Sequence, residues 1–296
     1  ITKTFTRSAH GNNYESAADD HGHNVVAADF GLTADALMQG TTAPGGSFPI
    51  VQLGCNSCHD PHGQVDGGTK GGAAAVTGSG SYGDDPTLAQ LGNYRLLGDT
   101  GYDGGEGGGQ NFSGGAPIAT APSLFAGGMS DTNHVAYGVG MSEWCANCHT
   151  GFTADSSNPM RHPANNDAHL GTEYSSNYNS YVKSGDFTGT AATAYLELVP
   201  FEQGVSDPTA LLPSSTAGPT TTANVSCLTC HRAHASAFQN MTRWDMETEF
   251  IADSHPQAGD GGVTGNDVLN SYYGRDMVAE FGQYQRSLCN KCHVQD

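Results

Sequence analysis

Cysteine and histidine follow one repeated pattern along this chain of 296 residues. Each of the 8 cysteines belongs to a C-x-x-C pair, and a histidine follows every pair directly. This is the sequence at which haem c is attached: the two thiols form thioethers with the porphyrin, and the adjacent imidazole binds the iron. The attachment residues would be Cys55, Cys58, Cys145, Cys148, Cys227, Cys230, Cys289 and Cys292, and the proximal ligands His59, His149, His231 and His293. The motifs therefore predict four covalently bound haem c groups.

Other chemistry of paired cysteines explains this pattern less well. A structural zinc site would join two C-x-x-C units, which makes a fixed histidine redundant. A redox-active or structural disulfide needs no histidine at all. We therefore interpret the chain as a tetrahaem cytochrome c.

Histidines outside the motifs are numerous enough to give every iron a second axial ligand. His62 and His234 stand three residues after a proximal histidine, in CNSCHDPH and CLTCHRAH. This spacing keeps the second imidazole from reaching the far face of its own haem, so it should bind a neighbouring haem. His162, shortly after the second motif, and His23, before an apolar run, complete the predicted distal set.

The remaining candidates for axial ligands rank lower. His134 and His255 are reserves, whereas His10, His21 and His169 are expected to be solvated. Methionine ligation by Met141 or Met160 is not needed, because the chain has more histidines than the four irons require as axial ligands. Paired histidines keep the haem potential lower than a Met/His pair does, so we expect four low-potential, low-spin haems.

The composition indicates that the cofactors form much of the core. Leu, Ile, Val and Phe make up only 46 of the 296 residues, and the net charge is −19. An ordinary chain of this kind is expected to be disordered. Four large apolar macrocycles can replace the missing side chains, so the predicted fold is mostly coil with a few short helices, organised around haem.

The chain is expected to form one continuous unit over residues 1–296. Its expected segments are 1–62 with the first motif, the Gly-rich loops 63–135, the second haem region 136–170, a linker 171–225, and the third and fourth haem region 226–296. Apolar spacing predicts the clearest helix over 269–288, before the last motif. A shorter helix is predicted over 243–254, with Trp244, Phe250 and Ile251 facing a haem.

Charge and hydropathy exclude several kinds of partner. The chain has 30 acidic and 11 basic residues, so nucleic acid and anionic membranes are poor partners. No stretch approaches 18 consecutive apolar residues, so no membrane span is predicted. The opening ITKTFTRSAH does not resemble a signal peptide, and we expect an exported protein from which one has been removed. Basic redox proteins or oxidised metal surfaces are more suitable partners.

Several motif-bearing stretches resemble a known group of proteins. They are GHNVVAADFG, APGGSFP, GCNSCHDPHG, SEWCANCHTGF with the later RHP, and SCLTCHRAH followed by RWD. These are similar to the outer-surface multihaem c-type cytochromes that polymerise into nanowires, and especially to the tetrahaem OmcE-like type. The resemblance implies bis-histidine haems in parallel and crossed pairs, little regular secondary structure, an extracellular location, and head-to-tail filaments that pass electrons to other cytochromes or external metal oxides.

The function expected is long-range extracellular electron transfer, not enzyme catalysis. Six-coordinate irons have no open position, so only outer-sphere transfer remains. The alternatives are a soluble periplasmic electron shuttle and, less favoured, a reductase with one open iron. For the filament, we expect a distal histidine from the first 62 residues, either His62 or His23, to bind a haem in the second half of the next subunit. Such a head-to-tail contact does not close and generates a filament.

Overall fold

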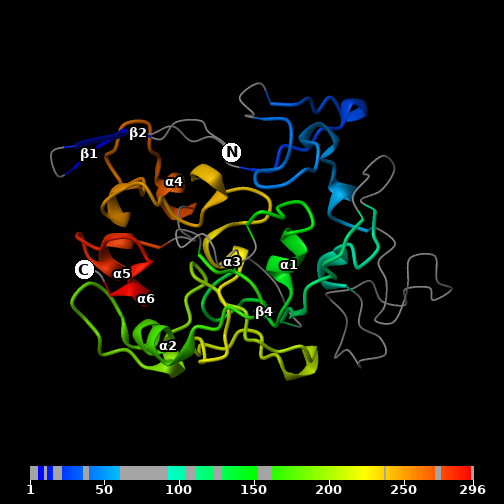
Figure 1. The fold of residues 1–296 in the computed structure, drawn as a ribbon. Helices are drawn as coiled ribbons and strands as arrows, with labels where there is room; N and C mark the ends of the chain where they lie inside the picture. The colour runs from blue at the N-terminus through cyan, green and yellow to red at the C-terminus, as the bar shows by residue number, and fades with distance from the viewer. Residues whose placement is uncertain are drawn as a thin grey trace.

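Short elements joined by long irregular segments make up the fold (Figure 1). The computed structural model describes residues 6–9, 12–15, 22–35, 40–60, 93–103, 111–122, 129–152, 162–236, 238–270 and 275–294. The α-helices are α1 Met141–Cys145, α2 Gly171–Ser180, α3 Cys227–Cys230, α4 Gly265–Asn270, α5 Met277–Phe281 and α6 Asn290–His293. The 3-10 helices are Ala28–Phe30, Ile50–Gln52, Cys55–Ser57, Tyr94–Leu96, Ala191–Thr193, Pro208–Ala210, Gln239–Met241 and Ile251–Asp253. The prediction of a mostly irregular chain with a few short helices is confirmed.

Two small antiparallel sheets are present among the described residues. Strands β1 (Thr6–Ala9) and β2 (Asn12–Glu15) form a hairpin in which Thr6 is opposite Glu15. Thr6 also exchanges backbone hydrogen bonds with Gly261, which fixes the hairpin beside the segment before α4. Strands β3 (Ala119–Thr120) and β4 (Ala136–Tyr137) form the second sheet. The first sheet thereby joins the beginning of the chain to its last quarter.

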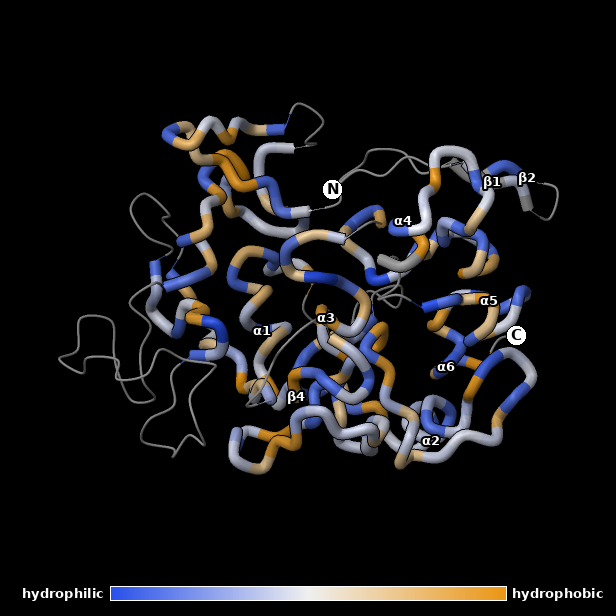
Figure 2. The backbone as a smooth tube through the Cα atoms, turned by 180° about the vertical axis from the view of Figure 1, so that it is seen from behind, coloured by the Kyte–Doolittle hydropathy of each residue, from blue (hydrophilic) through white to orange (hydrophobic). Residues whose placement is uncertain are grey.

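The buried apolar side chains form two main clusters around the cysteines. We call the larger one the C-terminal core, and it consists of Tyr178, Leu196, Leu198, Val199, Trp244, Ile251, Met277, Phe281 and Leu288. Cys230, Cys289 and Cys292 pack against it. The smaller cluster, the central core, consists of Tyr94, Leu97, Val135, Tyr137, Met141 and Leu228, with Cys145 packed against it. Apolar stretches along the backbone are short and interrupted (Figure 2), so each cluster gathers residues from distant segments.

The single helix expected over 269–288 was wrong, because the chain divides there into short helices. Asp276 lies before α5, and its carboxylate accepts the N–H of Ala279, which caps the helix. Gly282 ends α5 with a φ of 91°, a conformation that other residues rarely adopt. Both residues interrupt the apolar periodicity that predicted one continuous helix.

The helix expected over 243–254 was also wrong. Only Ile251–Asp253 is helical, and it is a 3-10 turn. The carboxylate of Asp245 accepts the N–H of Glu247 at 2.8 Å, a local turn that competes with helix formation. Trp244 and Ile251 are buried in the C-terminal core.

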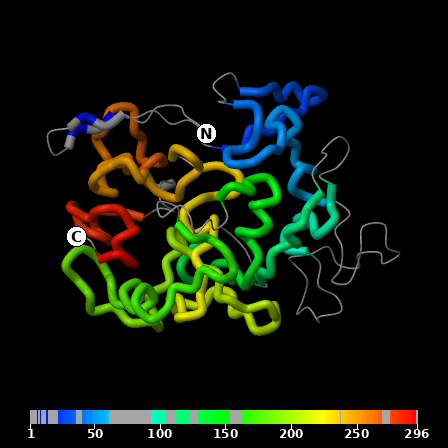
Figure 3. Tube along the Cα trace, viewed as in Figure 1, coloured from blue at the N-terminus to red at the C-terminus, as the bar shows by residue number. Residues whose placement is uncertain are grey.

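The segment after residue 22 and the C-terminal helices occupy different sides of the molecule. In Figure 3 the segment after residue 22 lies at the upper right, whereas α5 and α6 lie at the left beside the C-terminus. Among the described residues, no helix is long and apolar enough to cross a membrane.

Candidate haem sites

All four motifs use the same turn to project their side chains. In each, the backbone N–H of the histidine donates to the carbonyl of the first cysteine, four residues earlier. The N···O distances are 3.0 Å for His59, 3.0 Å for His149, 2.9 Å for His231 and 3.1 Å for His293. One helical turn directs the two thiols and the imidazole to neighbouring positions, as attachment to one porphyrin edge requires.

Backbone carbonyls orient the imidazoles of three of the four motif histidines. The Nδ1–H groups donate to carbonyl oxygens of segments distant from the motifs. The pairs are His59 with Arg95 at 2.9 Å, His149 with Pro44 at 2.8 Å, and His231 with Asn240 at 2.9 Å. Because a carbonyl only accepts, Nδ1 carries the proton and Nε2 keeps its lone pair for a metal.

Three pairs of imidazoles have the spacing that one metal ion imposes. The ring centroids are 5.9 Å apart for His59 and His234, 6.1 Å for His23 and His149, and 6.2 Å for His162 and His293. Two imidazoles on opposite sides of one metal, each bound at about 2.0 Å, have ring centres roughly 6 Å apart. The residues present therefore fit a bis-histidine haem at the first, second and fourth motifs.

The distal imidazole of His23 is held like a proximal one. Its Nδ1–H donates to the carbonyl of Ala233 at 2.6 Å, and its backbone N–H donates to the carbonyl of His234 at 3.0 Å. His23 and His234 thus stand side by side and face different proximal histidines. His23, which the sequence suggested as a donor to another subunit, lies opposite His149 of its own chain.

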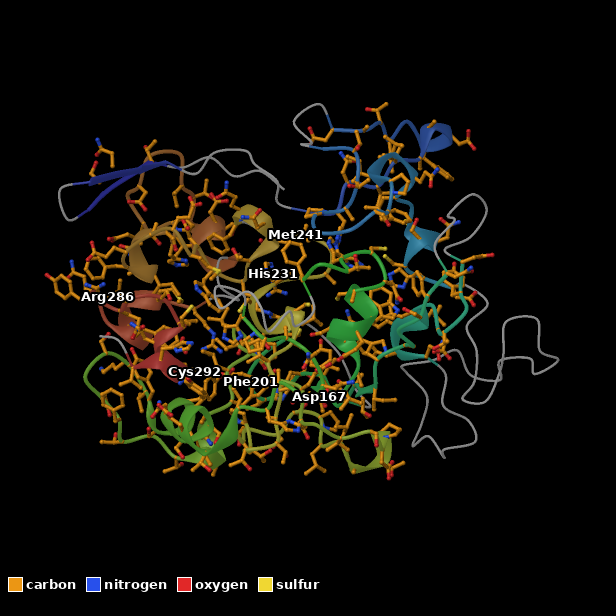
Figure 4. The ribbon with its side chains drawn as sticks, viewed as in Figure 1. Asp167, Phe201, His231, Met241, Arg286 and Cys292 are labelled. Atoms are coloured by element: carbon orange, nitrogen blue, oxygen red, sulfur yellow. The ribbon has the colours of Figure 1, made fainter. Side chains whose placement is uncertain are left out.

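The third motif differs from the other three. Within the described residues, no histidine ring is paired with that of His231 at the spacing found elsewhere. His62 lies outside the described residues, as do His10 and His21. His231 itself is near the middle of the molecule, close to Met241 (Figure 4).

The other described histidines have separate surroundings. His134 is buried and stacks on Tyr195, with ring centroids 3.6 Å apart and ring planes at 8°. Exposed His169 donates from Nδ1 to the side-chain oxygen of Asn224 at 2.6 Å. His255 is 2% exposed, so it is buried within the fold.

The motifs lie next to one another in the order of the sequence. Burial raises the pKa of the free Cys58 thiol to about 12, and the nearby thiol of Cys148 contributes to the increase. A hydrogen bond between Cys145 and Cys227 raises the pKa of the former and lowers that of the latter. These thiols stand for the thioether sulfurs of attached haem, so the first site adjoins the second and the second adjoins the third.

The third and fourth motifs are neighbours as well. Burial raises the pKa of the Cys230 thiol to about 12, with smaller contributions from Cys289 and Cys292. Lys291, a spacer residue of the fourth motif, is buried and donates from Nζ to the carbonyl of Tyr181 at 2.6 Å. Its Nζ also lies 4.6 Å from the ring centre of Tyr178, so the lysine fastens α6 to α2.

The first and third motifs share a feature of the backbone that the sequence does not reveal. The carbonyl that accepts from each proximal imidazole belongs to a residue with positive φ, 50° for Arg95 and 54° for Asn240. The residue after each belongs to the same turn: Leu96 accepts the N–H of Asp60 at 2.7 Å, and Met241 accepts that of Arg232 at 2.8 Å. Backbone carbonyls position these imidazoles. Because every residue has a carbonyl, the residue types in the sequence did not reveal these contacts.

The chain resembles known proteins in both sequence and fold. No family model matches the chain. The chain is 44% identical over 324 residues to the C-type cytochrome OmcS of Geobacter sulfurreducens, covering 100% of this chain and 74% of the relative. A cryo-EM structure of OmcS nanowires from the same organism matches with a TM-score of 0.82 at 43% identity, covering 99% of this chain and 78% of that one. A structure of the Outer Membrane Cytochrome S filament matches with a TM-score of 0.80 at 44% identity and the same coverage.

The resemblance to nanowire-forming cytochromes is thus confirmed, and the relative found is OmcS, a different member of that group from the OmcE-like type. Both the identity over the whole chain and the fold support the same assignment. The chain belongs to the OmcS family of multihaem c-type cytochromes.

Proposed function

We propose that this chain carries electrons over long distances outside the cell, as a subunit of a cytochrome filament with four bis-histidine haem c groups. The observation that carries the proposal is the series of imidazole pairs beside motifs that adjoin one another in order. Sites in direct succession are what electron transfer along the chain requires. The relatives from Geobacter sulfurreducens are described as nanowires and as a filament.

The proposed ligand set follows from the geometry and the motifs. Haem would be held by Cys55, Cys58, Cys145, Cys148, Cys227, Cys230, Cys289 and Cys292, with His59, His149, His231 and His293 as proximal ligands. His234, His23 and His162 would be the distal ligands of the first, second and fourth haems, supported by the centroid distances. The haems supply reversible one-electron chemistry, and the chain orients the imidazoles, keeps Nε2 free for iron and surrounds the ring edges.

We infer that the protein is not an enzyme. An iron with two imidazole ligands has no position for a substrate, so electron transfer to redox-partner cytochromes or metal oxides proceeds without bond formation. The test is the visible spectrum of the reduced protein with and without carbon monoxide. A low-spin spectrum that carbon monoxide leaves unchanged is expected, whereas carbon monoxide binding to the assembled filament would show an open-site enzyme.

Assembly would complete the third haem. His231 has no described histidine opposite it within its chain, so we place the ligand donated by the neighbouring subunit at this site. His62 is the candidate donor, because the H-x-x-H spacing directs it away from its own haem. A bond of this kind is heterologous and repeats from subunit to subunit, which produces a filament.

Two variants separate assembly from internal ligation. His62→Ala should yield non-filamentous protein in which one haem per chain binds carbon monoxide. His23→Ala is the matched control, since its partner His149 lies in the same chain: one haem should again bind carbon monoxide, but filaments should persist by negative-stain imaging. Intact filaments of His62→Ala with four low-spin haems would refute the role given to His62.

We further propose that residues 1–296 behave as one haem-threaded unit. Contacts between distant segments support this, including the hydrogen bond from His23 to His234 and that from the His149 imidazole to Pro44. Limited proteolysis of the intact haem protein should release no separately stable domain.

A further inference from the structure

Glu202 is a buried carboxyl group with one oxygen that lacks a hydrogen-bond partner. Its exposure is 0%, and Oε1 accepts the backbone N–H of Met141 at 2.7 Å. Oε2 is also buried and has no hydrogen-bond partner among the described residues. A fully ionised carboxylate is costly under these conditions. Burial raises the pKa of Glu202 to about 8, and the nearby Glu143 and Cys227 add to the increase.

This carboxyl lies where the second and third motifs meet. Met141, which Glu202 holds, begins α1, and that helix ends at Cys145. The hydroxyl of Ser142 in the same helix accepts the N–H of Cys227 at 3.1 Å, so α1 and α3 are joined directly. The charge of Glu202 contributes to the raised pKa of Cys145, which places the carboxyl within electrostatic reach of both cysteines.

Among the described residues, the groups that face Glu202 offer a hydrogen-bonding side chain but no counter-charge. Glu202 and Asn224 exchange backbone hydrogen bonds of 3.1 and 2.8 Å as a directly opposed antiparallel pair, so their side chains project to the same face. Asn224 is fully buried, and its Nδ2 has no hydrogen-bond partner among the described residues, whereas its oxygen accepts from exposed His169. One water between Asn224 Nδ2 and Glu202 Oε2 would satisfy both atoms.

The charged group that raises the pKa of Glu202 most, after burial itself, is another carboxyl, that of Glu143. Glu143 in α1 accepts the N–H of Asn166 with Oε1, and its buried Oε2 has no hydrogen-bond partner among the described residues. The influences that shift the Glu202 carboxyl include no Lys, Arg or His among the described residues. The proton affinity of the buried Glu202 carboxyl should therefore respond strongly to a charge placed beside it.

We propose that Glu202 is a redox-linked proton-binding site at the junction of the second and third haems. This inference rests on the proposed function, because it requires haems at Cys145 and Cys227. Glu202 takes up one proton from water when one electron arrives from the adjoining haem of the array, and it releases that proton when the electron leaves. One electron and one proton enter together, so the net charge of the junction stays constant.

Charge compensation explains the direction of the coupling. Reduction of a bis-histidine haem from ferric to ferrous removes one positive charge that had stabilised the carboxylate, so the affinity of Glu202 for a proton increases. Coupling between two binding events is reciprocal, and protonation of Glu202 must therefore favour reduction.

The experiment compares the intact haem protein with Glu202→Gln, Glu202→Asp and Glu173→Gln. Glu173, exposed on α2, is the matched control for removing one carboxyl charge. In reduced-minus-oxidised infrared spectra, the wild type should gain a protonated-carboxyl C=O band that shifts in D₂O. This band should be absent in Glu202→Gln and present in the other two variants. In parallel, the reduction potentials of two haems should fall with rising pH in the wild type. In Glu202→Gln, these potentials should depend much less on pH.

Each outcome decides the question. A wild type with no protonated-carboxyl band on reduction would overturn the proposal even if Glu202→Gln did not fold. If the protonated-carboxyl band and the pH dependence of the potentials are unchanged in Glu202→Gln, the proton binds to another group. All proteins are first checked for complete low-spin haem spectra, because an incomplete wild-type spectrum would contradict the proposed function instead.

Discussion

The segment 22–60 and the region 171–294 support the same cofactor motif in different ways. The region 171–294 contributes every residue of the C-terminal core, and Leu288, next to the fourth motif, is 1% exposed. The segment 22–60 has few buried side chains, among them Phe48, and leaves Phe30 85% and Val51 60% exposed. Single backbone contacts with later segments, such as the Gly151 N–H donating to the carbonyl of Gly45 at 2.6 Å, hold it in place.

The difference teaches that haem, bound as proposed, would have two structural roles in one chain. In the region 171–294 it would complete a core that the polypeptide already forms. In the segment 22–60 it would connect a thin layer of chain to distant motifs, because too few apolar side chains are present to close a core. Local stability should therefore increase along the sequence.

Removal of a haem should produce the largest contrast. Replacing Cys55 and Cys58 by Ala should remove the first haem and leave the region before Gly92 sensitive to protease. The equivalent replacement of Cys289 and Cys292 should leave 171–270 resistant, because most of the C-terminal core remains. Limited proteolysis with mass spectrometry reads both results. Equal resistance in the two variants would mean that the segment 22–60 has a core of its own.

Truncation of a core side chain should have the next largest effect. Trp244 is 1% exposed in the C-terminal core, so Trp244→Ala should lower the free energy of unfolding by about 3–5 kcal/mol. Phe30→Ala is the control, because a side chain that is 85% exposed should change it by less than about 0.5 kcal/mol. Denaturant titration of both haem proteins measures the two effects, and similar losses would contradict the contrast.

The carboxyl of Glu202, at the junction of the second and third motifs, should make stability depend on pH. Glu202 has a pKa raised from 4.5 to about 8, so the folded protein keeps a proton there that the unfolded chain loses. The free energy of unfolding should therefore fall as pH rises through this window, by about 5 kcal/mol in the reduced protein. Denaturant titration at several pH values should show this slope in the wild type and a smaller one in Glu202→Gln.

A change at a close backbone contact should have the smallest effect. A Cβ at Gly46 would lie 1.8 Å from the carbonyl oxygen of Cys148, so Gly46→Ala must displace the backbone. We expect a loss of about 1–3 kcal/mol, with faster hydrogen exchange confined to 40–60. Gly265→Ala, where a Cβ meets nothing within 4 Å, should leave exchange in that segment unchanged.

The sequence predicted the types of secondary structure, but not where the individual helices begin and end. The low apolar content correctly indicated short helices and much coil, whereas the apolar spacing of 269–288 indicated one long helix. Asp276 caps the start of α5 and Gly282 ends it at a positive φ, so the chain does not form one helix there. Apolar spacing stabilises a helix only where tertiary contacts bury its apolar face, and it did not prevail over these two local signals. Trp244 and Ile251, which were expected to face a haem, lie in the C-terminal core, against which Cys230, Cys289 and Cys292 pack.

The sequence by itself determined the cofactor chemistry, since covalent attachment requires two thiols and an imidazole at a spacing that is local in the chain. Only the tertiary structure decided which imidazoles face each other, because His23 and His149 or His162 and His293 are separated by more than a hundred residues. It also decided which carbonyls orient the proximal rings, since every residue has one. The tertiary structure also decided that the carboxyl of Glu202 is buried, because burial is a property of the folded chain and cannot be predicted from the residue type.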